Sequence, residues 1–230
     1  MIGERRMKIA IDGPVGAGKT TVARLLAQKL HMTYIDTGAM YRAVALAVAR
    51  RGLDCRDEAA VRGVLGGMSI EVSHDAASGA QLISLNGADV SEAIRSPEIS
   101  IGASEVSKFR DVRQKLVELQ RAIAAGADVV MDGRDIGTHV FPDADLKFFL
   151  TASAEMRARR RHSELLAKGG GVSYEDCLKD LKYRDENDSG RELAPLKAAD
   201  DAIVLDTGAM SAAEVADRLY GCVAAKAREA

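Results

Sequence analysis

The chain lacks the features that mark several classes of protein. Its 32 lysines and arginines are matched by 34 aspartates and glutamates, and the net charge of −2 argues against nucleic acid as the main partner. Three cysteines, Cys55, Cys177 and Cys222, lie far apart without a C-x-x-C pair, which fits a reducing cytoplasm. The four histidines show no zinc-ligand spacing. We therefore expect a cytoplasmic protein without a structural zinc site.

Long apolar stretches are also missing. No run of 18 apolar residues occurs, and residues 1–6 lack the apolar segment of a secretion signal, so we expect neither membrane spanning nor secretion. The N-K-x-D and D-x-x-G motifs of regulatory GTPases are absent, which disfavours a nucleotide-switched binding module. With 230 residues, 47% of them hydrophobic, the chain can form one sizeable core with insertions.

A glycine-rich stretch near the start carries the clearest chemistry. Residues 13–20 fit G-x-x-x-x-G-K-[ST], the phosphate-binding loop, between a predicted strand at 8–11 and a predicted helix at 20–30. Successive backbone N–H groups would converge on phosphate oxygens, Lys19 would reach the β- and γ-phosphates, and Thr20 would ligate Mg²⁺. The alternative is a glycine turn that matches by chance. The predicted ATP-binding residues are Gly13, Pro14, Val15, Gly16, Ala17, Gly18, Lys19, Thr20 and Thr21.

The order of the remaining segments predicts an α/β protein. Short apolar strands alternate with helices, which predicts a doubly wound parallel five-stranded sheet of the P-loop NTPase class. Apolar and polar residues alternate with period 2 in two segments, 69–73 and 81–85. This alternation predicts a small inserted antiparallel β subdomain; the alternative is a surface hairpin without function. The five sheet strands are expected at 8–11, 33–35, 129–131, 147–150 and 203–205, and helices at 20–30, 41–51, 53–65, 104–125 and 211–229.

An arginine-rich section precedes the last strand. Arg157 to Arg161 lie on one predicted helix, Gly169 to Gly171 interrupt it, and a capping box at Ser173 starts another, so we expect a mobile helical lid. The alternative is a solvated helix face. We expect a single domain whose core comprises residues 7–67, 104–154 and 193–230, with an inserted region at about 68–103 and the lid at about 155–192.

Polar groups collect after the strands of the predicted sheet, where ligands bind in doubly wound folds. Besides residues 13–20, these groups are Asp36–Arg42, Asp132–Thr138 and, through the lid, Arg157–Arg191. A phosphotransferase must neutralise the phosphates of two substrates and exclude water, and arginines on a closing lid can do both. The pattern therefore favours a kinase.

Over nearly its whole length the chain resembles the bacterial cytidylate kinases. The resemblance implies transfer of the ATP γ-phosphoryl group to CMP or dCMP, with Mg²⁺ as cofactor. It also implies that the insertion at about 68–103 is the nucleoside-monophosphate-binding region. Thr37 stands where that family often has serine, and Ser189 and Gly190 are less basic than its pattern. The segments that carry the resemblance are Ile11–Lys19, Asp36–Arg42, Asp132–Thr138, Phe141–Ala144 and Ala194–Leu196.

The resemblance also implies roles for single residues. Arginine suits phosphate because it pairs bidentately, and aspartate can accept two ribose hydroxyls. The implied acceptor-phosphate residues are Thr37, Tyr41, Arg42, Arg134 and Arg191; the cytosine residues are Ser104, Arg113 and Asp135; and the sugar residues are Arg184 and Asp188. The expected catalytic residues are Lys19, Arg134, Arg191 and the lid arginines Arg157, Arg160 and Arg161, which would face the donor phosphates.

Several alternatives stay open. Besides Thr20, either Asp36 or Asp132 is a candidate to assist Mg²⁺, although each is also a good turn cap. Tyr41 also fits a core position, and Ser104 also fits the N-cap of the helix predicted to start there. The rival functions are another small-molecule P-loop kinase, acting on UMP, gluconate or shikimate, and a nucleotide-switched module. We expect a monomer whose partners are ATP and CMP or dCMP, with no nucleic acid and no membrane.

Overall fold

The computed structural model of the chain describes residues 6–75, 77–167, 169 and 171–229, which form two compact units. The core unit comprises residues 1–34 and 126–230, and the inserted unit comprises residues 35–125. The core unit contains β1 (Lys8–Asp12), α1 (Lys19–Leu30), the start of β2 (Thr33–Asp36), β6 (Val129–Asp132), the π-helix η2 (Ile136–Val140), β7 (Leu146–Thr151), α6 (Ala154–Ala167), α7 (Tyr174–Ser189), β8 (Ile203–Asp206) and α8 (Ala212–Glu229). The inserted unit contains α2 (Thr37–Ala49), α3 (Glu58–Leu65), β3 (Ile70–His74), β4 (Gln81–Leu85), β5 (Ala88–Asp89), the 3-10 helix η1 (Ala93–Arg95), α4 (Pro97–Val106) and α5 (Arg110–Ala124).

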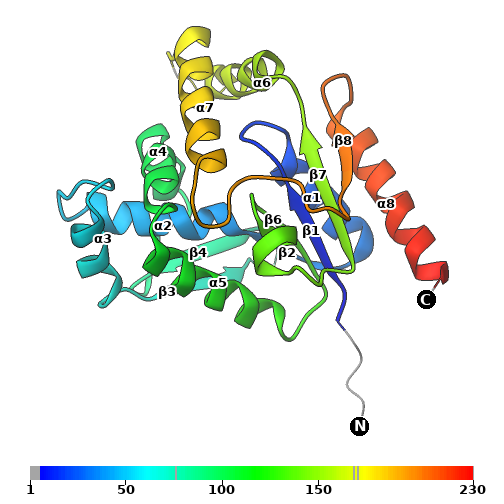
Figure 1. Cartoon of the computed structure of the whole chain (residues 1–230), viewed down its shortest axis with the longest axis horizontal. Coiled ribbons are helices and arrows are strands. Elements are labelled where there is room, and N and C mark those ends of the chain that lie inside the picture. The colour runs from blue at the N-terminus through cyan, green and yellow to red at the C-terminus, as the bar shows by residue number, and fades with distance from the viewer. Residues whose placement is uncertain (1–5, 76, 168, 170, 230) are drawn as a thin grey trace. The chain divides into compact units, whose positions relative to one another are not determined.

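The predicted parallel sheet is confirmed. Its strand order is β2-β6-β1-β7-β8, and β1 pairs in parallel with both β6 and β7 in the middle of the sheet (Figure 1). Apart from Lys8, Asp12 and Asp132 at their ends, the central strands β1 and β6 are apolar, because strands in the middle of a parallel sheet are buried on both faces. The carboxyl ends of β1 and β6 are therefore neighbours, and each is followed by one of the polar motifs found in the sequence.

Helices α1 and α8 pack together against the sheet. Val22 and Leu26 of α1, Val215 and Leu219 of α8, and Ile9 of β1 belong to one buried apolar cluster. This packing fixes the start of α1, and hence the loop that precedes it.

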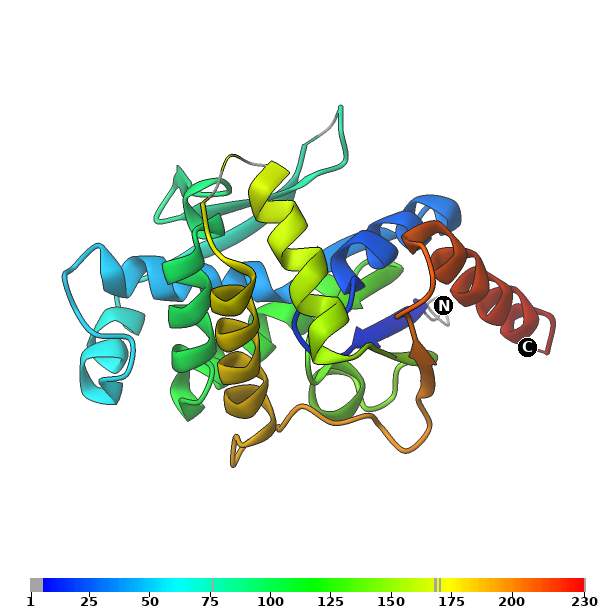
Figure 2. The same ribbon diagram turned by 90° about the horizontal axis from the view of Figure 1, so that it is seen from above.

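Two helices, α6 and α7, lie side by side in the section predicted to be a lid (Figure 2). Ser173 caps α7 by accepting the N–H of Asp176, as its capping box predicts. Gly169 has a positive φ of 78°, which favours glycine at this point of the connection, whereas the predicted hinge residue Gly170 lies outside the described residues. Whether the pair moves as a lid stays a prediction.

The inserted unit contains the predicted antiparallel hairpin, β3 with β4, and the short β5 extends it to three strands. The unit is larger than the predicted insertion at 68–103, since it also includes α2, α3 and α5. α2 begins at Thr37 rather than Tyr41, because the Asp36 side chain accepts the N–H of Ala39 and caps the helix.

The prediction of a single helix at 104–125 is wrong. The chain forms α4 and α5 instead, and breaks between them: Ser107 Oγ donates to the Ser104 carbonyl at 2.8 Å, and Phe109 is extended, with φ −83° and ψ 132°. Serine hydroxyls compete in this way for backbone acceptors. Ser96 is the N-cap of α4, with Pro97 as its first residue, so Ser104 lies inside a helix and the N-cap interpretation of Ser104 is also wrong.

Candidate active site

The glycine-rich loop joins the buried strand β1 to α1 and requires its glycines. A Cβ on Gly13 would lie 2.0 Å from the Leu150 carbonyl oxygen, and Gly13, Gly16 and Gly18 all have positive φ. Such a backbone lets several N–H groups point to one centre at the start of α1, where the helix dipole also favours an anion. The loop therefore has the geometry of a phosphate site.

Lys19 is enclosed by this loop. Its side chain is buried, and Nζ donates to the Pro14 carbonyl at 2.7 Å. Burial lowers the pKa of Lys19 to about 7, and the charge of Arg134 acts in the same direction. The carboxylates of Asp132 and Asp12 oppose this shift. A phosphate placed in the loop would favour the charged amine, so the site gains a cation where anionic charge arrives.

Thr20 and Asp132 meet next to the loop. Thr20 Oγ1 donates to Asp132 Oδ2 at 3.0 Å, and the Tyr34 hydroxyl donates to Asp132 Oδ1 at 2.7 Å. Asp132 ends the apolar strand β6, which is the sequence signal for its position. The other candidate for Mg²⁺, Asp36, caps α2, which agrees with the alternative that it serves as a turn cap. Its side chain also forms an ion pair with Arg42 at 2.7 Å.

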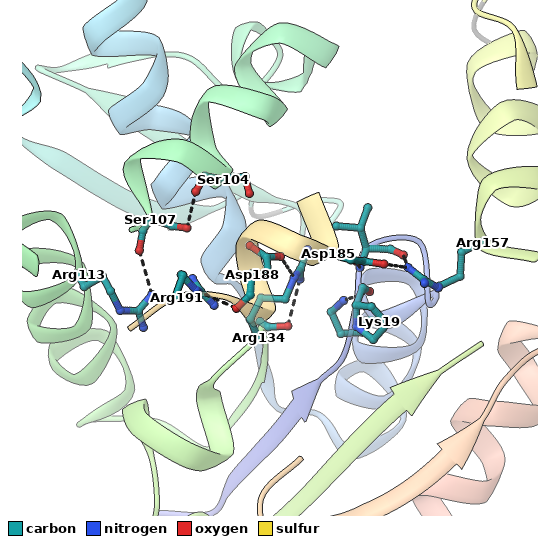
Figure 3. A network of polar contacts seen from close by, with 12 residues as sticks. Lys19, Ser104, Ser107, Arg113, Arg134, Arg157, Asp185, Asp188 and Arg191 are labelled. Carbon is teal, nitrogen blue, oxygen red and sulfur yellow. Dashed lines mark hydrogen bonds and ion pairs between the residues drawn. The ribbon is translucent and has the colours of Figure 1, made fainter. Parts of the chain in front are cut away.

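Arg157 connects the two lid helices to the phosphate loop within the core unit. Its Nε donates to the Ala152 carbonyl at 2.9 Å, and Nη1 donates to the Val15 carbonyl at 2.8 Å and to Asp185 at 2.6 Å (Figure 3). The Val15 N–H in turn donates to Asp185 at 3.3 Å. Sequence reasoning missed Asp185, because nothing in its run of charges distinguishes it from its neighbours.

The other two lid arginines have different partners. Arg160 donates to the carbonyl and hydroxyl of Thr207, just past β8, and the Thr207 hydroxyl donates to the Ala17 carbonyl at 3.1 Å. Arg161 forms an ion pair with Glu164 at 3.3 Å near the surface. Contacts between these arginines and the donor phosphates stay a prediction.

Three arginines surround Asp188 on the core unit. Arg134 Nε donates to Asp188 Oδ2 at 2.8 Å, and Arg191 Nε donates to the Asp188 carbonyl at 3.2 Å (Figure 3). Burial disfavours the charged carboxylate, but the charges of Arg134, Arg191 and Arg184 outweigh burial and lower the pKa of Asp188. Four residues implied to bind the acceptor thus lie in one cluster, in which Asp188 and Arg191 are buried and Arg134 and Arg184 are partly exposed.

Except for Asp135, the other implied acceptor residues lie in the inserted unit. Arg113 is 1% exposed; its Nη1 lies 3.5 Å from the Ser107 carbonyl, and its guanidinium lies 5.9 Å from the centre of the Tyr41 ring. Thr37 is buried at the start of α2 and Ser104 is buried within α4. Asp135, on the core unit, is buried in irregular backbone between β6 and η2.

The comparisons with known proteins agree on one family. A family model described as cytidylate kinase matches residues 9–225. The cytidylate kinase of Carboxydothermus hydrogenoformans is 50% identical over 220 residues, which are 96% of this chain and 98% of that protein. The cytidylate kinase of Geobacter sulfurreducens is 47% identical over 226 residues, 98% of this chain and 96% of that protein.

The solved structures that align with this chain share little sequence with it, so their similarity supports only the fold. A gluconokinase from Sinorhizobium meliloti aligns with a TM-score of 0.50 at 14% identity and covers 98% of this chain and 97% of its own. An uncharacterised protein from Eubacterium ventriosum aligns with a TM-score of 0.51 at 12% identity, over 95% of this chain and 98% of its own. Among the described residues, no helix combines the length and apolarity needed to cross a membrane.

Proposed function

Since the chain belongs to the cytidylate kinase family, we propose that it transfers the γ-phosphoryl group of ATP to CMP or dCMP. The products are ADP and CDP or dCDP. The observation that carries this proposal is the presence of two groups of cationic side chains in one unit: Lys19 within the glycine-rich loop, and the arginines around Asp188. A phosphoryl transfer between two nucleotides needs both, whereas nucleotide hydrolysis needs only the loop.

The loop N–H groups and Lys19 would hold the β- and γ-phosphates of ATP. The Lys19 ammonium would stabilise the negative charge that spreads over the transferring group, and this is where a fixed cation contributes most to rate. Arg134 and Arg191 would hold the phosphate of the acceptor in line with that group. Arginine suits this role because its fork pairs with two phosphate oxygens at once.

Thr20 and Asp132 are the residues that would hold Mg²⁺. The fit is supported by their chemistry and contact: a hydroxyl and a carboxylate, both hard oxygen ligands, lie within hydrogen-bonding distance at the end of the phosphate loop. Mg²⁺ usually takes only one or two protein oxygens and completes its shell with phosphates and water. When bound, it would help to neutralise the negative charge of the ATP phosphates. Tyr34 would keep the Asp132 carboxylate oriented.

Arg113 and Asp135 would read the cytosine base. Asp135 can only accept hydrogen bonds, so it suits the cytosine amine, whereas uracil has a carbonyl at that position. Arg113 can only donate, so it suits the unprotonated ring nitrogen of cytosine. Arg184 and Asp188 would hold the sugar, the latter by accepting ribose hydroxyls. Both arginines and both carboxylates are buried or partly buried, which strengthens such discrimination.

We further propose that the enzyme works as a monomer in the cytoplasm. The three cysteines, Cys55, Cys177 and Cys222, are free thiols, which suits a reducing compartment. Light scattering after size-exclusion chromatography tests the monomer. A dimer mass at micromolar concentration would overturn that part of the proposal.

A panel of acceptors tests the main proposal. The purified chain is incubated with ATP, Mg²⁺ and one of CMP, dCMP, UMP, AMP, gluconate or shikimate, and ADP is followed by a coupled assay. We expect rapid ADP formation with CMP and dCMP, little with UMP, and almost none without acceptor or with EDTA. A faster reaction with gluconate or shikimate would favour the other small-molecule kinases that share the fold. Equal ATP hydrolysis with and without acceptors would contradict any kinase function.

A further inference from the structure

Asp12 is a buried carboxylate that the proposed chemistry does not use. It is the last residue of β1, directly before Gly13 of the phosphate loop, and it is 4% exposed. Its Oδ1 accepts the N–H of Ile136 at 2.9 Å, and its Oδ2 accepts the N–H of Gly137 at 2.8 Å. Both oxygens are therefore bound to the first two residues of the π-helix η2.

The π-helix depends on this support. Helices with this hydrogen-bond pattern are rare and short, and the first N–H groups of any helix need acceptors from elsewhere. Asp12 supplies two of them. On another side, a Cβ on Gly137 would lie 3.1 Å from the Lys147 side chain, so the Lys147 stem packs closely against η2. Lys147 is itself fixed by the Pro142 carbonyl at 2.6 Å and by Asp201 at 2.9 Å.

The segment held by Asp12 directly follows two residues of the proposed acceptor site, Arg134 and Asp135. The Asp135 carbonyl accepts the N–H groups of His139 and Val140, at 2.9 and 3.1 Å, and thereby closes the turns of η2. The backbone of Asp135 is thus fixed from its carbonyl side by η2, and η2 is fixed by Asp12. A shift of η2 would move the point from which the Arg134 and Asp135 side chains project.

A carboxylate that is buried at this position lowers the stability of the fold, because its charged form loses contact with water. Burial raises the pKa of Asp12 to about 7, although the two N–H donors oppose this shift. The nearby charge of Asp135 raises the pKa further, and that of Lys19 lowers it. An uncharged side chain would avoid this desolvation cost, although asparagine, with a single carbonyl oxygen, could not give each of the two N–H groups its own acceptor. The presence of an aspartate at position 12 is therefore consistent with a role other than stabilising the fold.

We propose that Asp12 is a positioning residue: it ties the segment that carries Arg134 and Asp135 to the first residue of the phosphate loop, and so holds the acceptor in register with the donor. This inference rests on the proposed function, because it assigns the acceptor to Arg134 and Asp135. It predicts that loss of the Asp12 contact harms recognition of the acceptor base, and harms ATP binding little.

The test compares Asp12→Asn with the matched control Asp145→Asn. Asparagine keeps the shape of Asp12 but offers one acceptor in place of two. Asp145 lies directly before β7, and its side chain accepts the N–H of Lys8, at the opposite end of β1 from Asp12, at 2.8 Å. It therefore controls for the loss of a carboxylate that accepts a backbone N–H at the edge of the sheet. Steady-state kinetics with CMP and UMP, the KM for ATP, and amide hydrogen exchange of the nucleotide-free protein are measured for each.

For Asp12→Asn we expect kcat/KM for CMP to fall by ~10- to 100-fold, the order reported for small misplacements in active sites. The CMP/UMP preference should narrow, the KM for ATP should change by less than about twofold, and the Ile136 and Gly137 amides should exchange faster. Asp145→Asn should leave all of these values near those of the wild type. An unchanged CMP/UMP preference, or equal losses for ATP and CMP, would overturn the positioning role.

A second variant and a measurement without substrate keep the test conclusive if Asp12→Asn does not fold or the wild type is inactive. If Asp12→Asn does not fold, Gly137→Ala displaces η2 from the Lys147 side and should narrow the CMP/UMP preference as well; no change in that variant would overturn the inference. If the wild type does not phosphorylate CMP, the proposed function fails. The amide exchange of Ile136 and Gly137 still decides whether Asp12 holds η2, since it needs no substrate.

Discussion

Removal of the Asp188 carboxylate should affect both the stability of the fold and the choice of sugar. Its side chain is 7% exposed and that of Arg134 is 22% exposed, and the pair lies at 2.8 Å. Breaking a fully buried ion pair costs about 3–5 kcal/mol. Because Arg134 retains some contact with water, we expect Asp188→Ala to lower the free energy of unfolding by about 2–3 kcal/mol, which corresponds to roughly 5–10 °C in Tm for a chain of this size.

The functional effect follows from the proposed contact with the ribose. CMP and dCMP share the 3′-hydroxyl, so Asp188→Ala should weaken both. If Asp188 also accepts the 2′-hydroxyl, CMP loses one additional hydrogen bond to a charged group, about 1.5–3 kcal/mol. The ratio of kcat/KM for CMP to that for dCMP should therefore fall by roughly 10- to 150-fold.

Two measurements separate these effects. Thermal unfolding without nucleotide reports the ion pair, and initial rates at saturating ATP, with CMP or dCMP varied, report the sugar contact. Glu186→Ala is the matched control, because Glu186 is an exposed carboxylate on the same helix, α7. An unchanged CMP/dCMP ratio would remove the 2′-hydroxyl contact, and an unchanged Tm would contradict the stabilising role of the pair with Arg134.

Four further predictions follow from the same structure. Lys19→Ala should lower kcat by ~10²-fold or more with the Tm preserved, and near-normal turnover would refute the assignment of the loop. Asp135→Asn should narrow a CMP/UMP preference that exceeds about tenfold in the wild type; a smaller wild-type preference would contradict base reading by Asp135 and Arg113. Because burial raises the pKa of Asp12 from 3.8 to about 7, the folded chain binds more protons than the unfolded chain between these values, so stability should fall as pH rises through this range, by at most about 4 kcal/mol. Asp12→Asn should lack that component of the pH dependence, as urea unfolding at pH 5 and pH 8 would reveal. Hydrogen exchange across residues 155–191 should slow when ATP and CMP analogues are both bound, and equal exchange would argue against a closing lid.

The fold class was predictable because its signals are local. The loop motif is bounded by a strand and a helix, and the period of the apolar residues distinguishes the parallel sheet from the inserted hairpin. The break between α4 and α5 was missed because the apolar stripe, with Val106, Phe109 and Val112, continues across it. Ser96 followed by Pro97 was an available signal for the true start of α4.

The contacts of the charged side chains were less predictable. Asp12 and its donors at Ile136 and Gly137 are joined only by the pairing of β1 with β6, and nothing in the local sequence of Asp12 indicates such a contact. The resemblance to a family implied which residues matter, but not which of them contact one another. Only the fold brings Arg134 to Asp188, or Thr20 to Asp132.

The partners of Arg157 and Arg160 indicate how lid and loop are connected. Both guanidinium groups donate to neutral carbonyls, those of Val15 and Thr207, and these are weaker acceptors than phosphate oxygens. A triphosphate in the loop would therefore compete well for these donors. Asp185 differs, because it is a charged acceptor that binds both Arg157 and the Val15 N–H. If Arg157 faces the donor phosphates as predicted, its ion pair with Asp185 is the charged contact that phosphate would have to displace. We therefore predict that the affinity of the loop for ATP is coupled to the position of α7.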